Sequence, residues 1–280
     1  MRVTGLDRRL KTVIFVLFVV FVCGAVAFPF YWMIVSALQT GRGLFTYPPM
    51  LYPDNFEFKS FRTVLSNTGL PRWLWNSFLV SLASSLGALL VGAPGAYALS
   101  RFRYRGKNLF AILILTTQMM PPLVLVIPLF VIFRHLHLSD SLTGLVLANF
   151  TFALPVCVWM LRAIFDSIPE EIEEAARIDG CSYGQVLIRI TAPLALPGFV
   201  ATGIFAFLTS WDEFMFSRTV ITAKDKWVAS IGLSSFIGEY ITPWDEIMAA
   251  ATLFTVPPVI LFLLVQRYFV AGLAAGGVKG

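Results

Sequence analysis

Long uncharged stretches separated by short polar segments form the main pattern of this 280-residue chain. Each of six stretches holds at least 20 residues without Asp, Glu, Lys or Arg. An α-helix rises about 1.5 Å per residue, so roughly 20 residues cross a hydrocarbon layer of about 30 Å. The pattern therefore predicts six membrane spans. The uncharged windows are 12–41, 73–100, 108–133, 141–161, 190–211 and 247–266.

Helices are the structure that these windows predict. Backbone amides in lipid must be bonded within their own segment or in a closed barrel, and the windows lack the short alternation of barrel strands. We expect an all-α polytopic membrane protein whose residues 1–280 form a single transmembrane domain. The first window is too long for a signal peptide and no convincing cleavage site follows it, so we expect a retained anchor. The expected spans are about 13–38, 75–99, 108–133, 142–162, 193–217 and 247–268.

Basic residues beside the spans predict the orientation. Arg2, Arg8, Arg9 and Lys11 precede the first span, and the connection between spans two and three has four basic residues and no acid. Such clusters favour the cytoplasmic side. Both termini and the loop 166–192 are then expected in the cytoplasm, and 42–72, 134–140 and about 219–246 outside.

Composition supports lipid as part of the solvent, since 58% of the residues are apolar and only 13% are charged. The net charge of +5 does not indicate nucleic acid, because the basic residues form no continuous stripe or RNA-binding motif. Small residues recur in the second span between Ser81 and Gly95 and predict close helix packing there.

Cysteines and histidines give no sign of a disulfide framework or a metal site. The odd set of Cys23, Cys157 and Cys181 contains no CxxC spacing. His135 and His137 lie near Asp140, a grouping that is more often a solvated turn than a metal site, and we assign it no role. No metal is expected.

The segment after the fourth span differs from every other part of the chain. Ser167 and Glu170 fit a capping box that would begin a helix, Gly180 fits a left-handed stop, and Ser182 with Gln185 repeats the capping pattern. The second helix is expected to run to about residue 189, before Pro193 opens the fifth span. The segment therefore predicts a helix, a glycine turn and a second helix.

One face of the first of these helices is expected to be apolar. Ile172, Ala175 and Ala176 share it at i, i+3, i+4 spacing. Two interpretations remain open from the residues alone: a patch that receives a partner protein, or an amphipathic surface helix without a function.

A resemblance to a known family favours the first interpretation, a patch that receives a partner protein. Glu174-Ala175-Ala176, three residues, Gly180, nine residues, Ile190 and Pro193 resemble the cytoplasmic loop of importer-type ABC transporter permeases, written E-A-A-x3-G-x9-I-x-L-P. The pattern spans 20 residues with fixed spacing. It departs from the family at Ala192, where leucine is usual.

Further motifs resemble the second permease of maltose-, trehalose- and glycerol-phosphate-type importers, along nearly the whole chain. The chain is thus identified as a member of the sugar branch. The motifs are Pro53-Asp54-Asn55-Phe56, Phe61-Arg62-Thr63-Val64-Leu65, Asn76-Ser77, Ala96-Tyr97-Ala98-Leu99-Ser100-Arg101, Pro121, Gln266 to Leu273 and Gly276 to Gly280.

The resemblance implies a type I ABC importer permease domain, without catalysis, in the bacterial cytoplasmic membrane. Its partners would be a second homologous permease, two ATP-binding cassette subunits and an extracytoplasmic solute-binding protein. No cofactor is expected in this chain, which lacks GxxxxGK[ST]; ATP and Mg would bind the partner ATPase. The residues expected to couple to that ATPase are Glu174, Ala175, Ala176, Asp179 and Gly180.

Ionisable residues at the end of the fifth span suggest a substrate path. Asp212 and Glu213 follow Trp211, and carboxylates at that depth are costly unless they face protein or water. They would bind sugar hydroxyls while Trp211 stacks on the ring. An internal ion pair with Arg218, or one with the partner permease, is the alternative interpretation.

Two further regions acquire a role from the resemblance. The loop between spans five and six would reach into the binding protein, and an ordinary exposed loop is the alternative. The tail would contact the ATPase, or form a disordered end. The residues concerned are Gly232, Gly238 and Pro243 in the loop, and Gly276, Gly277 and Lys279 in the tail.

The function expected is a permease subunit that forms half of the path for a sugar or sugar derivative, driven by ATP hydrolysed elsewhere. A permease for a non-sugar solute and a secondary carrier are the alternatives. Secondary carriers usually have internal repeats and midspan charges in several helices, whereas this chain shows no evident repeat and has such charges only in the fifth span. A membrane-embedded enzyme is disfavoured, because no HExxH or GxSxG lies in the spans.

Overall fold

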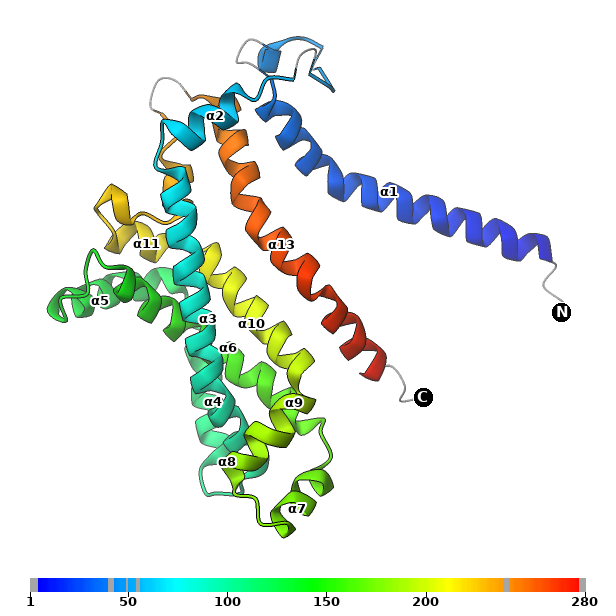
Figure 1. The fold of residues 1–280 in the computed structure, drawn as a ribbon, viewed down its shortest axis with the longest axis vertical. Helices are drawn as coiled ribbons and strands as arrows, with labels where there is room; N and C mark the ends of the chain where they lie inside the picture. The colour runs from blue at the N-terminus through cyan, green and yellow to red at the C-terminus, as the bar shows by residue number, and fades with distance from the viewer. Residues whose placement is uncertain (1–4, 40–42, 49, 54–55, 239–241, 277–280) are drawn as a thin grey trace. The chain divides into compact units, whose positions relative to one another are not determined.

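The computed structural model of the chain describes the backbone of residues 5–39, 43–48, 50–53, 56–238 and 242–276. Side chains are described for the same residues except 5–9, 43 and 268–276. Every regular element within these ranges is helical (Figure 1), so the expected all-α class is confirmed.

Four long apolar helices cover the residues of four expected spans. Each has at least 18 residues and enough hydropathy to cross a bilayer. Two further spans are present if each of two sharply bent helix pairs counts as one. The four long helices are α1 (Gly5–Ala37), α3 (Leu70–Arg101), α6 (Leu142–Asp166) and α13 (Trp244–Gly276).

The third expected span, 108–133, is a bent pair rather than one helix. α4 (Lys107–Thr117) and α5 (Pro122–His135) differ in direction by 94°. Pro121 and Pro122 lie at the break. A proline ring has no N–H to donate and drives the preceding residue out of the helical region, which explains why the helix stops here.

The fifth expected span is also bent, by 83° at Ala195. Pro193 and Pro197 flank this residue and remove two amide donors from the helical ladder. Only α10 forms a long helix within the expected span 193–217. It begins after the bend and ends at Trp211, six residues before the expected end. The elements in chain order are α8 (Tyr183–Val186), the π-helical η2 (Leu187–Thr191), α9 (Ala192–Leu194), α10 (Leu196–Trp211) and α11 (Met215–Val220).

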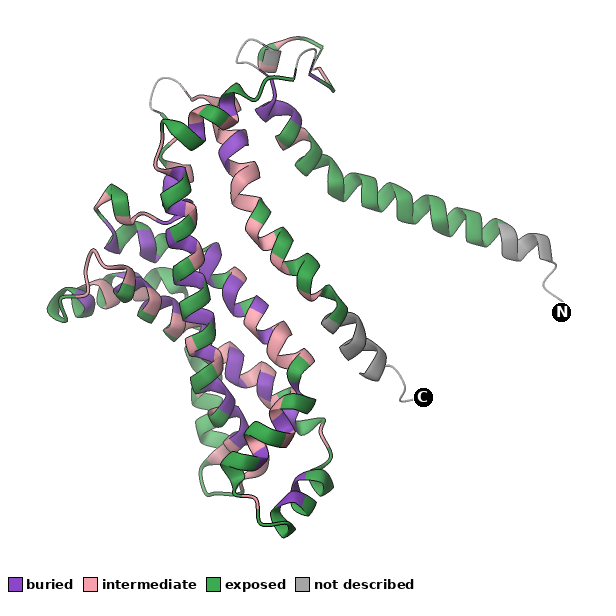
Figure 2. Ribbon diagram, viewed as in Figure 1, coloured by how far each residue is buried: buried purple, intermediate pink, exposed green. Residues whose placement is uncertain are grey.

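One compact unit of the chain contains α1, the short helices η1 (Gly43–Phe45) and α2 (Lys59–Ser66), and the first part of α13. Most of the described length of α1 is exposed, and its residues are buried only from Val35 onwards (Figure 2). Ser60 on α2 donates to Asp245 on α13 at 2.9 Å. Exposed apolar side chains on α1 fit a helix surrounded by lipid or by another chain.

The other unit contains nearly all of α3, the elements from α4 to α12, and the last part of α13. The remaining helices in it are α7 (Glu170–Ile178), η3 (Lys224–Lys226) and α12 (Ala229–Ser234). α10 packs along α6, and both lie beside α3 (Figure 1).

Small residues on α3 allow this close packing, as their recurrence predicts. A Cβ added at Gly87 would lie 3.2 Å from the Phe150 ring, and one at Gly92 would lie 3.4 Å from Cys157 Cβ. Both neighbours belong to α6. α3 and α6 therefore approach each other more closely at these two positions than larger side chains would permit.

Candidate functional site

A helix, a glycine turn and a second helix follow α6, as the residues of this segment predict. Gly180 has φ of +91°, a left-handed conformation that a glycine adopts without steric cost. The second capping box is confirmed. The Gln185 amide donates to Ser182 Oγ at 3.4 Å, and the Ser182 amide donates to Gln185 Oε1 at 2.8 Å.

The expected capping box at Ser167 is wrong. The Ser167 hydroxyl donates back to the Ile164 carbonyl at 2.7 Å, and Pro169 occupies the N-cap position of α7 without a side-chain cap. Ser167 therefore ends α6 instead of starting α7. The second helix also continues beyond residue 189, through η2 to Leu194.

α7 exposes one face and buries another (Figure 2). Ala176 is only 8% exposed, so the expected apolar patch of Ile172, Ala175 and Ala176 is only partly presented. Ile178, which the spacing did not single out, is 87% exposed and is the most prominent apolar side chain on this face. The exposed members of the expected coupling set are Glu174, Ala175, Asp179 and Gly180.

The inner face of α7 is held by a buried carboxylate, that of Glu173. Tyr97 Oη donates to Glu173 Oε2 at 2.8 Å, and Arg101 Nη2 and Thr191 Oγ1 donate to Oε1 at 3.0 and 2.9 Å. Arg101 Nη2 also donates to the Ile168 carbonyl at 2.8 Å. The segment is therefore fixed both to the end of α3 and to η2.

The charge state of Glu173 follows from these contacts. Burial alone would raise the pKa of its carboxyl, but hydrogen bonds from Arg101, Tyr97 and Thr191 hold the pKa below its ordinary value. Glu173 is therefore ionised near neutral pH, and it pairs with the guanidinium of Arg101 in a site where both side chains are more than 90% buried.

A second candidate site is a cavity of about 220 Å³ among α5, α6, α10 and α11. Aromatic and aliphatic side chains form most of its wall, as is usual for small-molecule sites. Its polar lining comes from the break between α4 and α5, from α6 and from the end of α10. The polar residues are Gln118, Asn149, Thr209, Ser210 and Glu213.

Asn149 is the polar group at this cavity with an unfilled hydrogen-bonding capacity. Its Nδ2 donates to Ser210 Oγ at 2.8 Å, whereas its Oδ1 is buried without a partner among the residues that the structure describes. A buried amide oxygen without a partner is costly. The atom has no accessible surface, so a molecule in the cavity could donate to it only after a local side-chain movement.

The three residues expected to line a substrate path divide between different surroundings. Trp211 is buried and stacks on Phe207, with ring centroids 5.6 Å apart, so its ring is no open platform for a sugar. Asp212 is exposed. Glu213 lines the cavity, and its carboxylate accepts the amides of Phe216 and Ser217 at 2.6 and 2.9 Å.

Those two amides explain why Glu213 tolerates its position. They belong to the start of α11, where backbone N–H groups lack partners within the helix. In the described part of the chain no ion pair joins Glu213 to Arg218, so the expected internal alternative is replaced by a helix cap.

Residues 84–274 match the family described as the binding-protein-dependent transport system inner membrane component. The match covers α7 and the cavity, together with most of the remaining chain. The chain belongs to this family.

Curated relatives of the permease cover similar lengths. It is 36% identical over 253 residues to the sulfoquinovosyl glycerol transport system permease protein SmoH of Agrobacterium fabrum. The aligned region covers 90% of this chain and 89% of the relative. It is 33% identical over 253 residues to the diacetylchitobiose uptake system permease protein DasC of Streptomyces coelicolor, with coverage of 90% and 92%.

The fold is shared with a solved transporter. A chain in the crystal structure of a bacterial ABC transporter involved in the import of the acidic polysaccharide alginate is similar, with a TM-score of 0.79 and 23% identity. The similarity covers 95% of the permease and 98% of that chain. The expected ABC importer permease fold is thereby confirmed.

The permease holds the segment after α11 through polar contacts. Asp140 Oδ1 accepts the amides of Thr222 and Ala223 at 2.9 and 3.0 Å, and Lys226 Nζ donates to Asp140 Oδ2 at 2.9 Å. Asn76 Nδ2 donates to the Trp227 carbonyl at 2.8 Å. Asp140 is thus part of a structural clamp and not a freely solvated turn.

The loop and tail residues singled out in the permease sequence lie in separate places. Gly232 is buried on α12, where an added Cβ would lie 2.1 Å from Trp73 Cε3. Gly238 is exposed, and Pro243 precedes α13. Gly276 is the last residue of α13, and Gly277 and Lys279 lie outside the described residues.

Several residues of the two sites were not found from the sequence. Glu173 precedes Glu174, the glutamate that belongs to the family motif. Only the orientation of α7 about its axis shows that Glu173 is the one that points inward. Asn149 and Gln118 did leave a signal, because an amide inside an uncharged window is expected to face protein or a cavity. Tyr97 and Arg101 belonged to a motif without an assigned role.

Proposed function

We propose that the permease is one of two pore-forming subunits of an ATP-driven importer for a sugar or sugar derivative, in the bacterial cytoplasmic membrane. The single observation that carries this proposal is the exposed face of α7 and its glycine turn, held on a rigid base. The names of the relatives support the sugar class, since they include permeases for sulfoquinovosyl glycerol, diacetylchitobiose and trehalose.

The exposed face of α7 suits docking to an ATPase. Glu174 and Asp179 provide negative charge for a basic rim, and Ala175 and Gly180 have too little side chain to prevent close approach. Ile178 adds an apolar contact. ATP and Mg would bind in the partner subunits, and their closure would move the spans as rigid bodies to change access from outside to inside.

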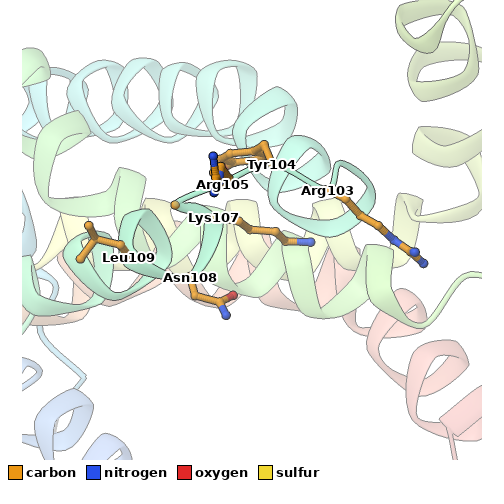
Figure 3. A pocket seen from close by; sticks show the side chains of 7 residues that line it. Arg103, Tyr104, Arg105, Lys107, Asn108 and Leu109 are labelled. Carbon is orange, nitrogen blue, oxygen red and sulfur yellow. The ribbon is translucent and has the colours of Figure 1, made fainter.

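The orientation with α7 in the cytoplasm agrees with the basic connection between α3 and α4. This connection borders an open recess, which is lined by Arg103, Arg105 and Lys107 (Figure 3). Basic residues next to spans favour the cytoplasmic side. The segment from Thr222 to Lys226 would then face outward, toward a solute-binding protein.

The cavity beside Asn149 is the candidate sugar contact. Sugars present hydroxyl groups that both donate and accept, and the oxygens of Asn149, Gln118 and Thr209 can accept from them. Gln118 Nε2 and the Thr209 hydroxyl already donate to the carbonyls of Phe152 and Phe205 at 3.3 and 2.8 Å. The apolar wall from Phe152 and Phe205 would lie against the sugar ring. A second permease would complete the path.

Charge reversal on α7 tests the coupling. The double variant Glu174→Lys with Gly180→Asp should abolish ATP-driven uptake and co-purification with the ATPase, because it adds like charge and strain at the docking face. Glu57→Lys, the same charge change at an exposed residue before α2, is the matched control and should leave both unchanged.

Two results would contradict the proposal. One is normal ATP-driven uptake by the double variant, and the other is uptake or counterflow by the purified permease in vesicles that contain no ATPase. The second result would instead favour a secondary carrier.

A further inference from the structure

Three elements that are distant in the sequence converge on one carboxylate. Tyr97 and Arg101 come from the last turns of α3, Glu173 from the inner face of α7, and Thr191 from the end of η2. All three partners donate to the Glu173 carboxylate at 2.8 to 3.0 Å. The position of α7 is thus defined relative to both α3 and the helix that leads into α10.

The side chains of this cluster are almost fully shielded from solvent. The side chains of Arg101 and Glu173 are 7% and 6% exposed, and Tyr97 is 4% exposed. A desolvated ion pair loses much of its stabilising effect unless its geometry is good and its remaining oxygens are bonded. Here both carboxylate oxygens have donors, whereas the buried Arg101 Nε has no partner among the described residues.

Arg101 also fixes the chain just before α7. Its Nη2 donates to the Ile168 carbonyl at 2.8 Å, and its Nη1 lies 3.9 Å from the exposed Glu170 carboxylate. One guanidinium therefore contacts both the entry to α7 and its first turn. A displacement of α7 must either carry the end of α3 with it or break these bonds.

The route from Thr191 leads to the cavity. Thr191 ends η2, the short α9 follows, and after the bend at Ala195 α10 runs to Ser210 at the cavity wall. Backbone hydrogen bonds make each helical piece stiff, and Ala195 joins the two pieces at a bend of 83°. The same carboxylate therefore connects the exposed face of α7 directly with α3 and, through η2 and α9, with α10.

We propose that Glu173, Tyr97, Arg101 and Thr191 form a latch that transmits movement of α7 to α3 and α10. This inference rests on the proposed function, since it requires an ATPase that moves α7. These four are positioning residues, since in this proposal they act through α7 and not on nucleotide or sugar. The latch assigns a role to the Tyr97 and Arg101 motif at the end of the second span.

The alternative to a latch is a purely structural cluster that only stabilises the fold. A structural cluster, when weakened, would lower the amount of assembled transporter, and each remaining complex would import as much sugar per ATP as before. A latch, when weakened, would leave assembly intact and lower the number of sugars imported per ATP hydrolysed.

Tyr97→Phe is the sharpest variant, because it removes one hydroxyl and leaves the ring packing. Tyr104→Phe is its matched control, since Tyr104 lies just after α3 and its side chain is 44% exposed. Thr191→Val removes a second donor from the same carboxylate. Glu173→Gln removes the charge, and it carries the greater risk of unfolding because it leaves Arg101 buried beside an uncharged partner.

The measurement is made on the complete transporter in lipid nanodiscs or vesicles. Assembly is followed by co-purification, and sugar uptake and ATP hydrolysis are followed in the same preparation. Changes within a coupling network alter coupling by about two- to thirtyfold, so Tyr97→Phe and Thr191→Val should each lower sugar imported per ATP within that range. Assembly and the Tyr104→Phe transporter should match wild type.

Three outcomes would overturn the latch. They are an unchanged sugar-to-ATP ratio in Tyr97→Phe and Thr191→Val, a loss of uptake that follows the loss of assembled complex, and an equal effect of Tyr104→Phe. The proposed function fails separately, if the wild-type permease does not associate with an ATPase at all. If the wild type and the variants all import the same number of sugars per ATP hydrolysed, the latch is refuted and the proposed function is not.

Discussion

The amide side chain of Asn149 has one hydrogen-bonding group that is paired and one that is not. Its Nδ2 bonds Ser210 on α10, which joins α6 to α10, while its Oδ1 stays buried without a partner among the described residues. Polar atoms in such surroundings are normally paired. The exception belongs to a side chain at the wall of the cavity that we propose as the sugar contact.

Replacing this side chain should therefore affect transport. We expect Asn149→Ala to lower the uptake rate of the reconstituted transporter by about tenfold at saturating binding protein, because a hydrogen bond of about 1 to 1.5 kcal/mol to the sugar is lost. Asn108→Ala, at an exposed asparagine near the start of α4, is the matched control and should leave the rate unchanged. Equal rates for Asn149→Ala and wild type would exclude this contact.

Gly232 shows a different residue-scale constraint. The Trp73 ring fills the space where a Cβ would be, and its Nε1 donates to the Lys224 carbonyl at 2.8 Å. The ring is bonded in place and cannot move aside freely. The requirement for glycine at this position is therefore explained by packing inside the permease.

At the scale of elements, the segment containing η3 depends on a clamp from the turn between α5 and α6. Backbone amides of Ala223 and Thr222, together with the Lys226 ammonium, bond the Asp140 carboxylate and lower its pKa from 3.8 to about 2. A carboxyl with a lowered pKa stabilises the folded form above its ordinary pKa. This stabilisation is lost as the pH falls from about 4 toward 2.

Removing the carboxylate should release the segment. We expect Asp140→Ala to reduce the hydrogen-exchange protection of the Thr222 and Ala223 amides by about ten- to a hundredfold at neutral pH, since bonds to a charged group contribute about 1.5 to 3 kcal/mol each. The measurement is hydrogen–deuterium exchange with correction for the intrinsic rate. In the wild type the same protection should weaken only below about pH 4.

The control for this experiment is Asp225, an acidic residue close in sequence to Thr222 and Ala223. Asp225 pairs with Arg72 at 3.3 Å, but both side chains are more than half exposed, and such surface pairs contribute little. Asp225→Ala should leave the Thr222 and Ala223 amides protected. Loss of protection in Asp225→Ala, or none in Asp140→Ala, would contradict the clamp.

At the scale of the whole molecule, the native cysteines offer a test of orientation. Cys181 lies in the turn between α7 and α8 and is partly exposed, whereas Cys157 is buried and Cys23 lies within α1. With Cys23→Ser and Cys157→Ala, one thiol reports on the α7 side of the membrane. Ile237→Cys, at a side chain that is 69% exposed, reports on the expected outer loop when Cys181 is also replaced by Ser.

We expect a membrane-impermeant maleimide to label Ile237→Cys in intact cells and Cys181 only in inverted vesicles. The physical reason is the bias of basic residues toward the cytoplasmic side, which acts on the connection between α3 and α4. Labelling of Cys181 in intact cells would place α7 outside and would remove the basis for coupling to an ATPase.

The sequence by itself determined the membrane class, because uncharged stretches of 20 residues or more leave the backbone no alternative to helices in lipid. It also determined the glycine turn at Gly180 and the cap at Ser182, since both depend on interactions within a few residues. The family motif at Glu174 likewise lies in a short segment of fixed spacing.

Only the tertiary structure decided which residues of these segments meet. The rotation of α7 turned Glu173 inward and Glu174 outward, because Tyr97, Arg101 and Thr191 approach it from helices 18 to 76 residues away. The bend at Pro121 places Gln118 and Pro122 at the cavity, and the bend at Ala195 separates α10 from the helix that bonds Glu173. Such long-range contacts depend on how whole helices pack, and spacing along one segment contains no information about them.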